Sequence, residues 1–560
     1  MDHATRVIRL STRADHAPHK SQVEVEKAYG PLRETPELGL DAGLRAWMGS
    51  AAVIKATPRG LLLLYTPAAR GELMLEQLRR ELAQRKGLLD EVVCTPALLQ
   101  ALQQKAGGPP VSGEALRTVY DSQFRGMVTQ AMEQGASDLH FRMRNAGGET
   151  QARLYLRLDG ELELVDDSMS PQQMHELVAA AYAKSDQKSL AVGEGQFNLQ
   201  VPLSSFIRLP DLRNVELRFQ SAPERYGFDA TIRVLNFDGR TANYGDLAAL
   251  GYLPDQQDML KEHGHGPGGA VLFSGETGSG KTTALNTLLA THPGVQNRTL
   301  YASTLEDPPE GRPPNVSQFA VARSATQGGI GESNPFLSAL RVRMRSDGDI
   351  VVIGEIRDGA TAEMFAQLGM TGHKEYASLH APSCKGAYER LTSSMMGLPT
   401  ELVASPDVMG LTVYQTLVPR LCPHCRIPAQ TAWADALNRR KLHRLSELGL
   451  EPSALFVRNY EGCSRCRKGR SGVQVVAEMF APNEEQRLLI SQGRIPEAFH
   501  RWRAGRTAAL AEPATGGKTA FEVALYFCQQ GLLGVDTLDR VVSRILSYEA
   551  VRADGQRSQD

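Results

Sequence analysis

The residues best suited to chemistry form a glycine-rich segment near the middle of the chain. Gly275–Thr282 reads G-E-T-G-S-G-K-T and fits G-x-x-x-x-G-K-[ST], with an apolar run before it and helix-forming residues after it. Glycines let successive backbone N–H groups turn inward around phosphates, and the following helix adds its positive end. The segment therefore predicts a site for ATP and Mg²⁺. The residues expected to contact the nucleotide are Gly275, Glu276, Thr277, Gly278, Ser279, Gly280, Lys281, Thr282 and Thr283.

Two residues at the end of this loop have separate expected roles. The Lys281 ammonium should reach the β and γ phosphates, and the Thr282 hydroxyl should hold Mg²⁺. A second triplet, Gly517-Lys518-Thr519, has Glu512 where the first glycine should stand, and no strand precedes it. We interpret that second triplet as an ordinary loop.

A carboxylate at the end of another apolar run is a candidate for activating water. Asp349–Glu355 reads D-I-V-V-I-G-E, which predicts a strand that delivers an acid to the carboxyl edge of a sheet. There Glu355 could polarise the attacking water or bind Mg²⁺ through water. A lone acid at a strand end is usually a solvated surface residue, but the phosphate loop earlier in the chain favours the catalytic interpretation.

Four of the seven cysteines form two close C-x-x-C pairs. Each pair can present two thiolates to one tetrahedral Zn²⁺. The 37 residues between Cys425 and Cys463 exceed the usual zinc spacing, but a helical insertion around Ala432–Leu448 can return the second pair. A redox pair is the alternative, although it needs a thioredoxin-like context that the sequence does not offer. The expected zinc ligands are Cys422, Cys425, Cys463 and Cys466.

Composition is that of an ordinary soluble protein. The 560 residues are 42% hydrophobic and 22% charged with a formal net charge of −1, which argues against a general nucleic-acid binder. No apolar run approaches the roughly 18 residues that span a bilayer, and the N-terminus lacks the features of a secretory signal. We expect a cytoplasmic protein that reaches a membrane only through partners.

The order of the patterns predicts an α/β protein of several parts. Strands at Ala270–Phe273, Leu300–Thr304 and Ile350–Ile353 alternate with helical stretches, which is typical of a parallel sheet with crossover helices. A break at Gly107–Pro110 is a plausible boundary, and the tail should contain a helix at Asp536–Tyr548. The predicted segments are an accessory domain (1–115), a mixed α/β domain (116–240), a P-loop ATPase core (246–420), a tetracysteine module (421–475) and a helical region (476–560).

Further stretches resemble the assembly ATPases of type II secretion systems and type IV pili, within the secretion-ATPase superfamily. The likeness covers about 120–480 and implies a RecA-like core, a preceding PAS-like domain, a zinc module and a helical tail. Thr304–Glu310 resembles the Asp box of that family, Gly354–Asp358 its Walker B ending, Thr371–His380 its His box, and Ala136–His140 with Asp159-Gly160 its second N-terminal domain.

The resemblance implies roles for five side chains. Glu306 would position Mg²⁺ or water, Glu355 would be the catalytic carboxylate, and His380 would sense the γ-phosphate. Arg218 and Arg233 resemble arginines that close onto nucleotide from the N-terminal domain. A guanidinium offers forked donors to a phosphate, which suits that role. Without the resemblance, either arginine is more often a surface strand residue.

Two departures from the family pattern suggest a divergent branch. Lys374-Glu375 follows His373 where the family tends to be apolar, and Gln415-Thr416-Leu417 replaces the usual Gln-Arg-Leu. Neither departure affects the expected phosphate chemistry.

The sequence thus predicts an ATPase, converting ATP to ADP and phosphate, that drives pilus assembly or type II secretion. The resemblance implies a homohexamer that passes motion to an inner-membrane platform protein and other secretion or pilus components. A pilus-retraction or type IV secretion ATPase is one alternative, against which the tetracysteine module and the long N-terminal region argue. A DNA-binding or DNA-translocating P-loop protein is another. The basic cluster Arg465, Arg467, Lys468 and Arg470 supports it, but such runs are more often solvated surface, so nucleic acid is not the expected partner.

Overall fold

The computed structural model of the protein divides into two compact units, residues 1–235 and 236–560, and each unit is described by itself. The predicted break at Gly107–Pro110 lies outside the described residues. The described residues are 25–26, 32, 48, 51–57, 60–66, 69, 73–84, 88–94, 99, 113–146, 149–185, 197–209, 211–212, 215–225, 227–236, 246–307, 309, 311–321, 335–549 and 551.

The first unit begins with a small sheet and one helix. Strand β2 lies between an antiparallel β1 and a parallel β3. Leu62, Leu63 and Leu64 of β2 are all fully buried, because the sheet packs apolar side chains on both of its faces. The elements are β1 (Ala52–Thr57), β2 (Gly60–Tyr65), α3 (Leu73–Gln84) and β3 (Leu88–Val93).

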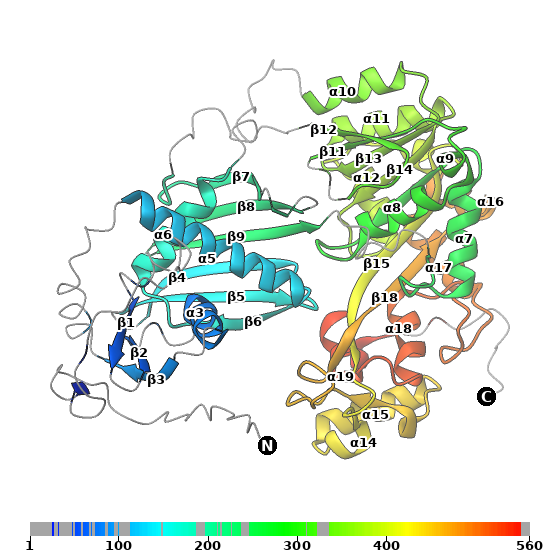
Figure 1. Ribbon diagram of the computed structural model, residues 1–560. Coiled ribbons are helices and arrows are strands. Elements are labelled where there is room, and N and C mark those ends of the chain that lie inside the picture. The colour runs from blue at the N-terminus through cyan, green and yellow to red at the C-terminus, as the bar shows by residue number, and fades with distance from the viewer. Residues whose placement is uncertain are drawn as a thin grey trace, which may run out of the picture. The chain divides into compact units, whose positions relative to one another are not determined.

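The rest of the first unit is a six-stranded sheet in the order β6-β5-β4-β9-β8-β7, with helices α5 and α6 packed together against it (Figure 1). Asp159 and Gly160 both take positive φ, as the tight turn between β5 and β6 requires. The elements are α5 (Gly113–Glu133), β4 (Asp138–Ala146), β5 (Glu149–Leu158), β6 (Glu161–Asp166), α6 (Pro171–Tyr182), β7 (Leu203–Arg208), β8 (Val215–Glu224) and β9 (Gly227–Asn236).

The second unit is built on a seven-stranded sheet in the order β12-β11-β13-β14-β10-β15-β18. All neighbouring pairs from β12 to β15 are parallel, and only β18 runs antiparallel to its neighbour. The strands are β10 (Ala270–Ser274), β11 (Ala302–Glu306), β12 (Val316–Ala320), β13 (Ile350–Ile356), β14 (Lys374–Leu379), β15 (Met409–Leu421) and β18 (Arg470–Phe480).

Helices cover both faces of this sheet and bury one apolar core on each (Figure 1). One face carries α7 (Pro254–His265), α8 (Lys281–Thr291) and α9 (Pro293–Gln296). The other carries α10 (Pro335–Met344), α11 (Gly359–Met370), α12 (Cys384–Thr392), α13 (Thr400–Ala404), α16 (Glu484–Ser491) and α17 (Ile495–Ala504). The predicted α/β class with a parallel sheet and crossover helices is confirmed.

The cysteine-bearing segment and the C-terminal helices share a third core, in which Leu445 and Leu525 are fully buried. Their elements are β16 (Ile427–Pro428), α14 (Ala429–Ala432), α15 (Ala436–Glu447), η3 (Pro452–Ala454), β17 (Phe456–Val457), α18 (Ala520–Gln529), α19 (Val535–Val541) and η4 (Ile545–Ser547). The single tail helix predicted at Asp536–Tyr548 is wrong. Asp539 accepts a hydrogen bond from the Ile545 backbone N–H, which replaces the helical one and separates α19 from η4.

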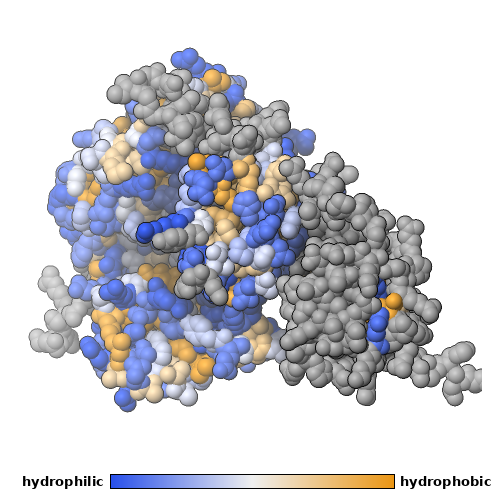
Figure 2. All heavy atoms as spheres, turned by 90° about the vertical axis from the view of Figure 1, so that its left-hand side faces the viewer, coloured by the Kyte–Doolittle hydropathy of each residue, from blue (hydrophilic) through white to orange (hydrophobic). Residues whose placement is uncertain are grey.

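Among the described residues, no helix combines the length and the apolar character that crossing a bilayer requires. On the face that Figure 2 shows, hydrophilic residues are interspersed with small hydrophobic groups.

Candidate active site

The residues predicted to act on nucleotide follow four neighbouring parallel strands, β11, β13, β14 and β10. Glu306 ends β11, Glu355 is the penultimate residue of β13, His380 follows β14, and the glycine-rich loop follows β10. Carboxyl ends of parallel strands meet at one edge of a sheet, so the fold gathers these groups there. Separate stretches of sequence therefore converge on the phosphate loop.

The loop has the backbone that phosphate binding demands. Gly275, Gly278 and Gly280 have φ values of 146°, 80° and 84°, a region that other residues rarely adopt. A Cβ on Gly275 would also lie 2.4 Å from the backbone oxygen of Gln415, so both the φ value and the lack of space require a glycine there. Gly280 then begins α8, whose N-terminus faces the loop.

Lys281 lies within the curve of the loop. Its Nζ donates to the carbonyl oxygens of Gly275 and Glu276 at 2.7 and 2.8 Å, and the residue is 8% exposed. Its neighbour Thr282 is half-buried in the first turn of α8. A buried ammonium at the rim of an N–H-lined loop can bind a phosphate with few competing waters. Of the other expected contacts, Ser279 is buried, whereas Glu276, Thr277, Gly278 and Thr283 are exposed.

The Glu355 carboxylate is held on both oxygens. Oε1 lies 3.1 Å from Nε2 of His380, and Oε2 accepts from Nε and Nη2 of Arg357 at 2.7 and 2.6 Å. Burial, together with the positive charge of Lys281, lowers the pKa of His380 below its ordinary value. The imidazole is therefore neutral at pH 7 and can donate Nε2–H to the carboxylate. This arrangement fixes the direction of the Glu355 side chain.

Glu306 lies beside this pair at the end of β11. This strand is the neighbour of β13 and lies one strand further from β10, which the loop follows. Its side chain is 7% exposed, and Oε1 accepts from the Gln318 amide at 3.3 Å. A Cβ on Gly354 would lie 3.0 Å from Cγ of Glu306. The glycine before Glu355 therefore leaves the space that Glu306 occupies.

The two predicted arginines belong to the first unit, on β8 and β9. Arg233 pairs with Asp138 across the sheet, Nε to Oδ1 at 2.9 Å, and Asp138 itself is buried. Arg218 is half-buried on the same sheet. Their predicted closure on nucleotide stays a prediction.

The four paired cysteines come together at the end of β15. All four Sγ atoms lie within 4.8 Å of one another, with Cys422–Cys463 at 3.9 Å and Cys425–Cys466 at 3.7 Å. A tetrahedral Zn²⁺ with bonds of about 2.3 Å would space its sulfur ligands by about 3.8 Å. The separations far exceed a disulfide bond. The cluster therefore fits a closed, structural four-sulfur zinc site.

Lys374-Glu375, the pair that departs from the family pattern, places two ionisable side chains inside the second unit. Nζ of Lys374 donates to the carbonyl oxygens of His263, Gly268 and Gly269, which caps the end of α7. Burial lowers the pKa of Lys374 to about 8. Glu375 is fully buried on the opposite face, and neither carboxylate oxygen has a hydrogen-bond partner among the described residues. Burial raises the pKa of Glu375 well above its ordinary value, so this carboxyl is neutral.

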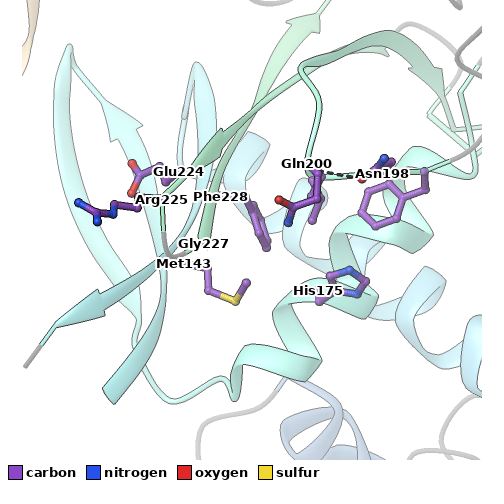
Figure 3. Close-up of a pocket in the computed structure, with 10 residues that line it drawn as sticks. Met143, His175, Asn198, Gln200, Glu224, Arg225, Gly227 and Phe228 are labelled. Carbon is purple, nitrogen blue, oxygen red and sulfur yellow. Dashed lines mark hydrogen bonds between the residues drawn. The ribbon is translucent and has the colours of Figure 1, made fainter. Parts of the chain in front are cut away.

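A hollow in the first unit contains none of the predicted residues (Figure 3). It measures about 430 Å³, and His175 meets Phe197 edge-to-face at 5.4 Å on its wall. Its polar side chains at Asn198, Gln200 and Arg225 are exposed to solvent. The lining is Met143, His175, Phe197, Asn198, Leu199, Gln200, Glu224, Arg225, Gly227 and Phe228.

Three residues near the loop have contacts there that were not predicted from the sequence. Arg357 forms an ion pair with Glu355. Gln415 donates a hydrogen bond to the loop, and Tyr252 donates one to Gln415. Arg357 could have been suspected from its place two residues after the acid. For the other two, no pattern in the sequence indicates contact with the loop.

The parallel sheet, the glycine-rich loop and the acids at the strand ends define a P-loop NTPase with a RecA-like core. Residues 118–522 match the family described as "Type II/IV secretion system protein". The chain belongs to this family.

Relatives agree with that assignment. The chain is 29% identical over 429 residues to the type IV pilus assembly ATPase PilB of Acinetobacter baylyi, covering 74% of this chain and 65% of the relative. It is 31% identical over 371 residues to the type II secretion system protein HxcR of Pseudomonas aeruginosa, covering 66% of this chain and 67% of the relative. The match thus spans about two thirds of the length of these relatives. A solved structure of the pilus retraction motor PilT with bound ADP is also similar, at 18% identity and a TM-score of 0.47, covering 74% of this chain and 94% of that one.

Proposed function

We propose that the protein is an ATPase that hydrolyses ATP to ADP and phosphate to power type IV pilus assembly or type II secretion. One observation carries the proposal. Beside a glycine-rich loop of phosphate-binding geometry, the Glu355 carboxylate is aimed by His380 on one oxygen and by Arg357 on the other. Membership of the secretion-protein family supports the biological setting.

Each site residue has a distinct part in the proposed reaction. The loop N–H groups and Lys281 bind the β and γ phosphates, and Thr282 with Glu306 holds Mg²⁺ or its water. Mg²⁺, when bound with ATP, neutralises charge that develops on the transferred phosphoryl group. Glu355 orients the attacking water and accepts its proton, while His380 lies where it can respond to the γ-phosphate.

The remaining parts of the proposal concern assembly. Cys422, Cys425, Cys463 and Cys466 hold one structural Zn²⁺. Arg218 and Arg233 close from the first unit onto nucleotide, either in the same chain or in a neighbouring one. A homohexamer in the cytoplasm, recruited by an inner-membrane platform protein, then converts turnover into movement, since head-to-tail interfaces close into rings and can couple neighbouring sites.

Hydrolysis by the purified protein tests the enzymatic proposal. Wild type is compared with Glu355→Gln, which keeps the shape of the side chain but removes the base, and with Lys281→Ala. Glu389→Gln is a matched control, because Glu389 is an exposed α12 acid paired with Lys385. We expect Glu355→Gln to bind ATP but lose turnover, Lys281→Ala to lose binding and turnover, and the control to match wild type. Undiminished hydrolysis by Glu355→Gln would assign water activation to another residue.

Each assay is run with and without DNA. Hydrolysis that ignores DNA supports the secretion or pilus motor. Turnover that appears only with DNA, and falls steeply with salt, would instead favour a nucleic-acid translocase.

A further inference from the structure

Gln415 packs against the back of the phosphate loop. It lies just past the stretch of β15 that pairs with β10, and it is fully buried. Its Nε2 donates to the backbone oxygen of Ser279 at 2.8 Å. Its own backbone oxygen lies close enough to Gly275 to exclude any side chain there. One residue therefore touches the loop near both of its ends.

Tyr252 holds the other end of the Gln415 side chain. Its hydroxyl donates to Oε1 of Gln415, and the residue is 3% exposed. Burial raises the pKa of this phenol, so the hydroxyl keeps the proton it donates. The tyrosine backbone is itself fixed, since its N–H donates to Leu247 and its carbonyl accepts from the Gln257 amide at 2.7 Å. The amide of Gln415 is thus held between two buried partners.

The direction of the Ser279 carbonyl matters for phosphate binding. In a planar trans peptide, the C=O of one residue and the N–H of the next point in opposite directions. A Ser279 oxygen tied to Gln415 therefore turns the Gly280 N–H away from Gln415, toward the side of the loop on which phosphate binds. Without this tie, the Ser279–Gly280 peptide, flanked by a glycine with positive φ, is free to rotate.

We propose that Gln415 and Tyr252 are positioning residues that set the Ser279–Gly280 peptide of the phosphate loop for nucleotide. The proposal rests on the function proposed above. It also links that peptide to the segment 246–253, which directly precedes α7. Tyr252 acts only through Gln415, so its contribution to nucleotide affinity disappears when Gln415 is gone.

A double-mutant cycle on nucleotide affinity tests this chain of contacts. MgADP affinity is measured with a fluorescent analogue for wild type, Tyr252→Phe, Gln415→Leu and the double variant, and kcat and KM for MgATP are measured beside it. We expect Gln415→Leu to weaken binding about tenfold and Tyr252→Phe about fivefold, with KM rising more than kcat falls. The double variant should bind like Gln415→Leu, because the two residues form one chain. Additive effects, or wild-type affinity in both single variants, would overturn the proposal.

Matched controls separate positioning from loss of stability. Gln486→Leu and Tyr388→Phe make the same changes at buried residues of α16 and α12, which have no hydrogen bond to the loop. Both should leave MgADP affinity unchanged whatever they do to the melting temperature. Should Gln415→Leu fail to fold, Tyr252→Phe, which removes one oxygen atom, still decides the matter. Lys281→Ala distinguishes the two proposals, since normal hydrolysis by that variant would refute the role of this loop as the phosphate site, whatever Gln415 and Tyr252 do.

Discussion

Glu355 and His380 lie 3.1 Å apart, carboxylate Oε1 to imidazole Nε2, at the ends of two adjacent parallel strands. The pKa of His380 is lowered, with burial as the main cause and Lys281 as the next, so the imidazole is neutral near pH 7. The Glu355 carboxylate therefore meets a neutral donor on one side and the Arg357 cation on the other.

This pair predicts an acid limb in the pH profile of turnover. As the pH falls below the ordinary histidine value of about 6.5, His380 gains a proton, and the resulting imidazolium holds Glu355 in an ion pair that competes with its contact to the attacking water. We expect kcat to fall in this range and His380→Gln to flatten the fall. Steady-state rates between pH 5 and 8, with refolding checked after each exposure, measure it. An identical acid limb in His380→Gln would assign the titration to another group.

Arg233 offers a way to separate a nucleotide role from a structural one. Arg233→Ala leaves the buried Asp138 with the Ser137 hydroxyl at 2.7 Å and the Arg157 Nε at 3.8 Å, so its charge loses the nearer cation and the variant should lose about 1–3 kcal/mol of stability. If the arginine also contacts nucleotide, turnover should fall at least about tenfold. Adding Asp138→Asn should restore part of the stability but none of the turnover. Turnover that recovers together with stability would make Arg233 a purely structural residue.

Glu375 predicts a stability that declines with rising pH. Its carboxyl stays neutral in the folded protein, while in the unfolded chain it ionises above about pH 4.3. The folded state then binds the extra proton, so its stability falls by up to about 1.4 kcal/mol per pH unit until the raised folded pKa is reached.

Glu375→Gln should remove that decline. Its melting temperature should exceed that of wild type by a margin that grows between pH 5 and 7. The range stops there because Lys374, with a pKa lowered to about 8, acts in the opposite sense at higher pH. A margin that stays constant with pH would mean that Glu375 is ionised or paired in the folded state.

The cysteine cluster predicts loss of a metal on a single substitution. Cys463→Ser should lower the bound zinc from about one per chain and destabilise the core that the cysteine segment shares with the C-terminal helices. Elemental analysis and thermal melts with and without a chelator measure both effects. Cys528→Ser is the control, because this buried thiol lies outside the cluster and should leave the zinc content unchanged. Unchanged zinc in Cys463→Ser would refute four-thiolate ligation.

The sequence was most informative where chemistry restricts the choice of residue. The glycines of the phosphate loop, the acid that ends an apolar strand and the spacing of the cysteines each have few structural solutions. Glu355 could accordingly be predicted at the carboxyl edge of the sheet from its strand alone, whereas His380, which lies 3.1 Å away, was expected near the γ-phosphate only through the family resemblance. The helix around Ala432–Leu448 was recognisable too, although it begins later, where the Asp435 side chain caps it.

Contacts between residues far apart in the sequence could not be predicted from residue type or spacing. Tyr252 and Gln415 look like ordinary polar residues, and their hydrogen bond depends on how the end of one loop folds against β15. In the sequence, Lys374 is notable only as a departure from a family pattern. In the structure, its ammonium caps α7, a helix that ends more than a hundred residues earlier. The reason is physical: such bonds depend on tertiary packing, which a single sequence records only indirectly.

Strand β15 joins two of these features. It runs over 13 residues from Met409 to Leu421 (Figure 1). Gln415 contacts the phosphate loop, and Cys422 directly follows the last residue of the strand. The seven residue steps from Gln415 to Cys422 span about 23 Å when extended. An extended chain hydrogen-bonded to β18 has almost no slack, so β15 can lengthen very little. A mechanical load applied at the cysteine cluster would reach the nucleotide loop along one strand.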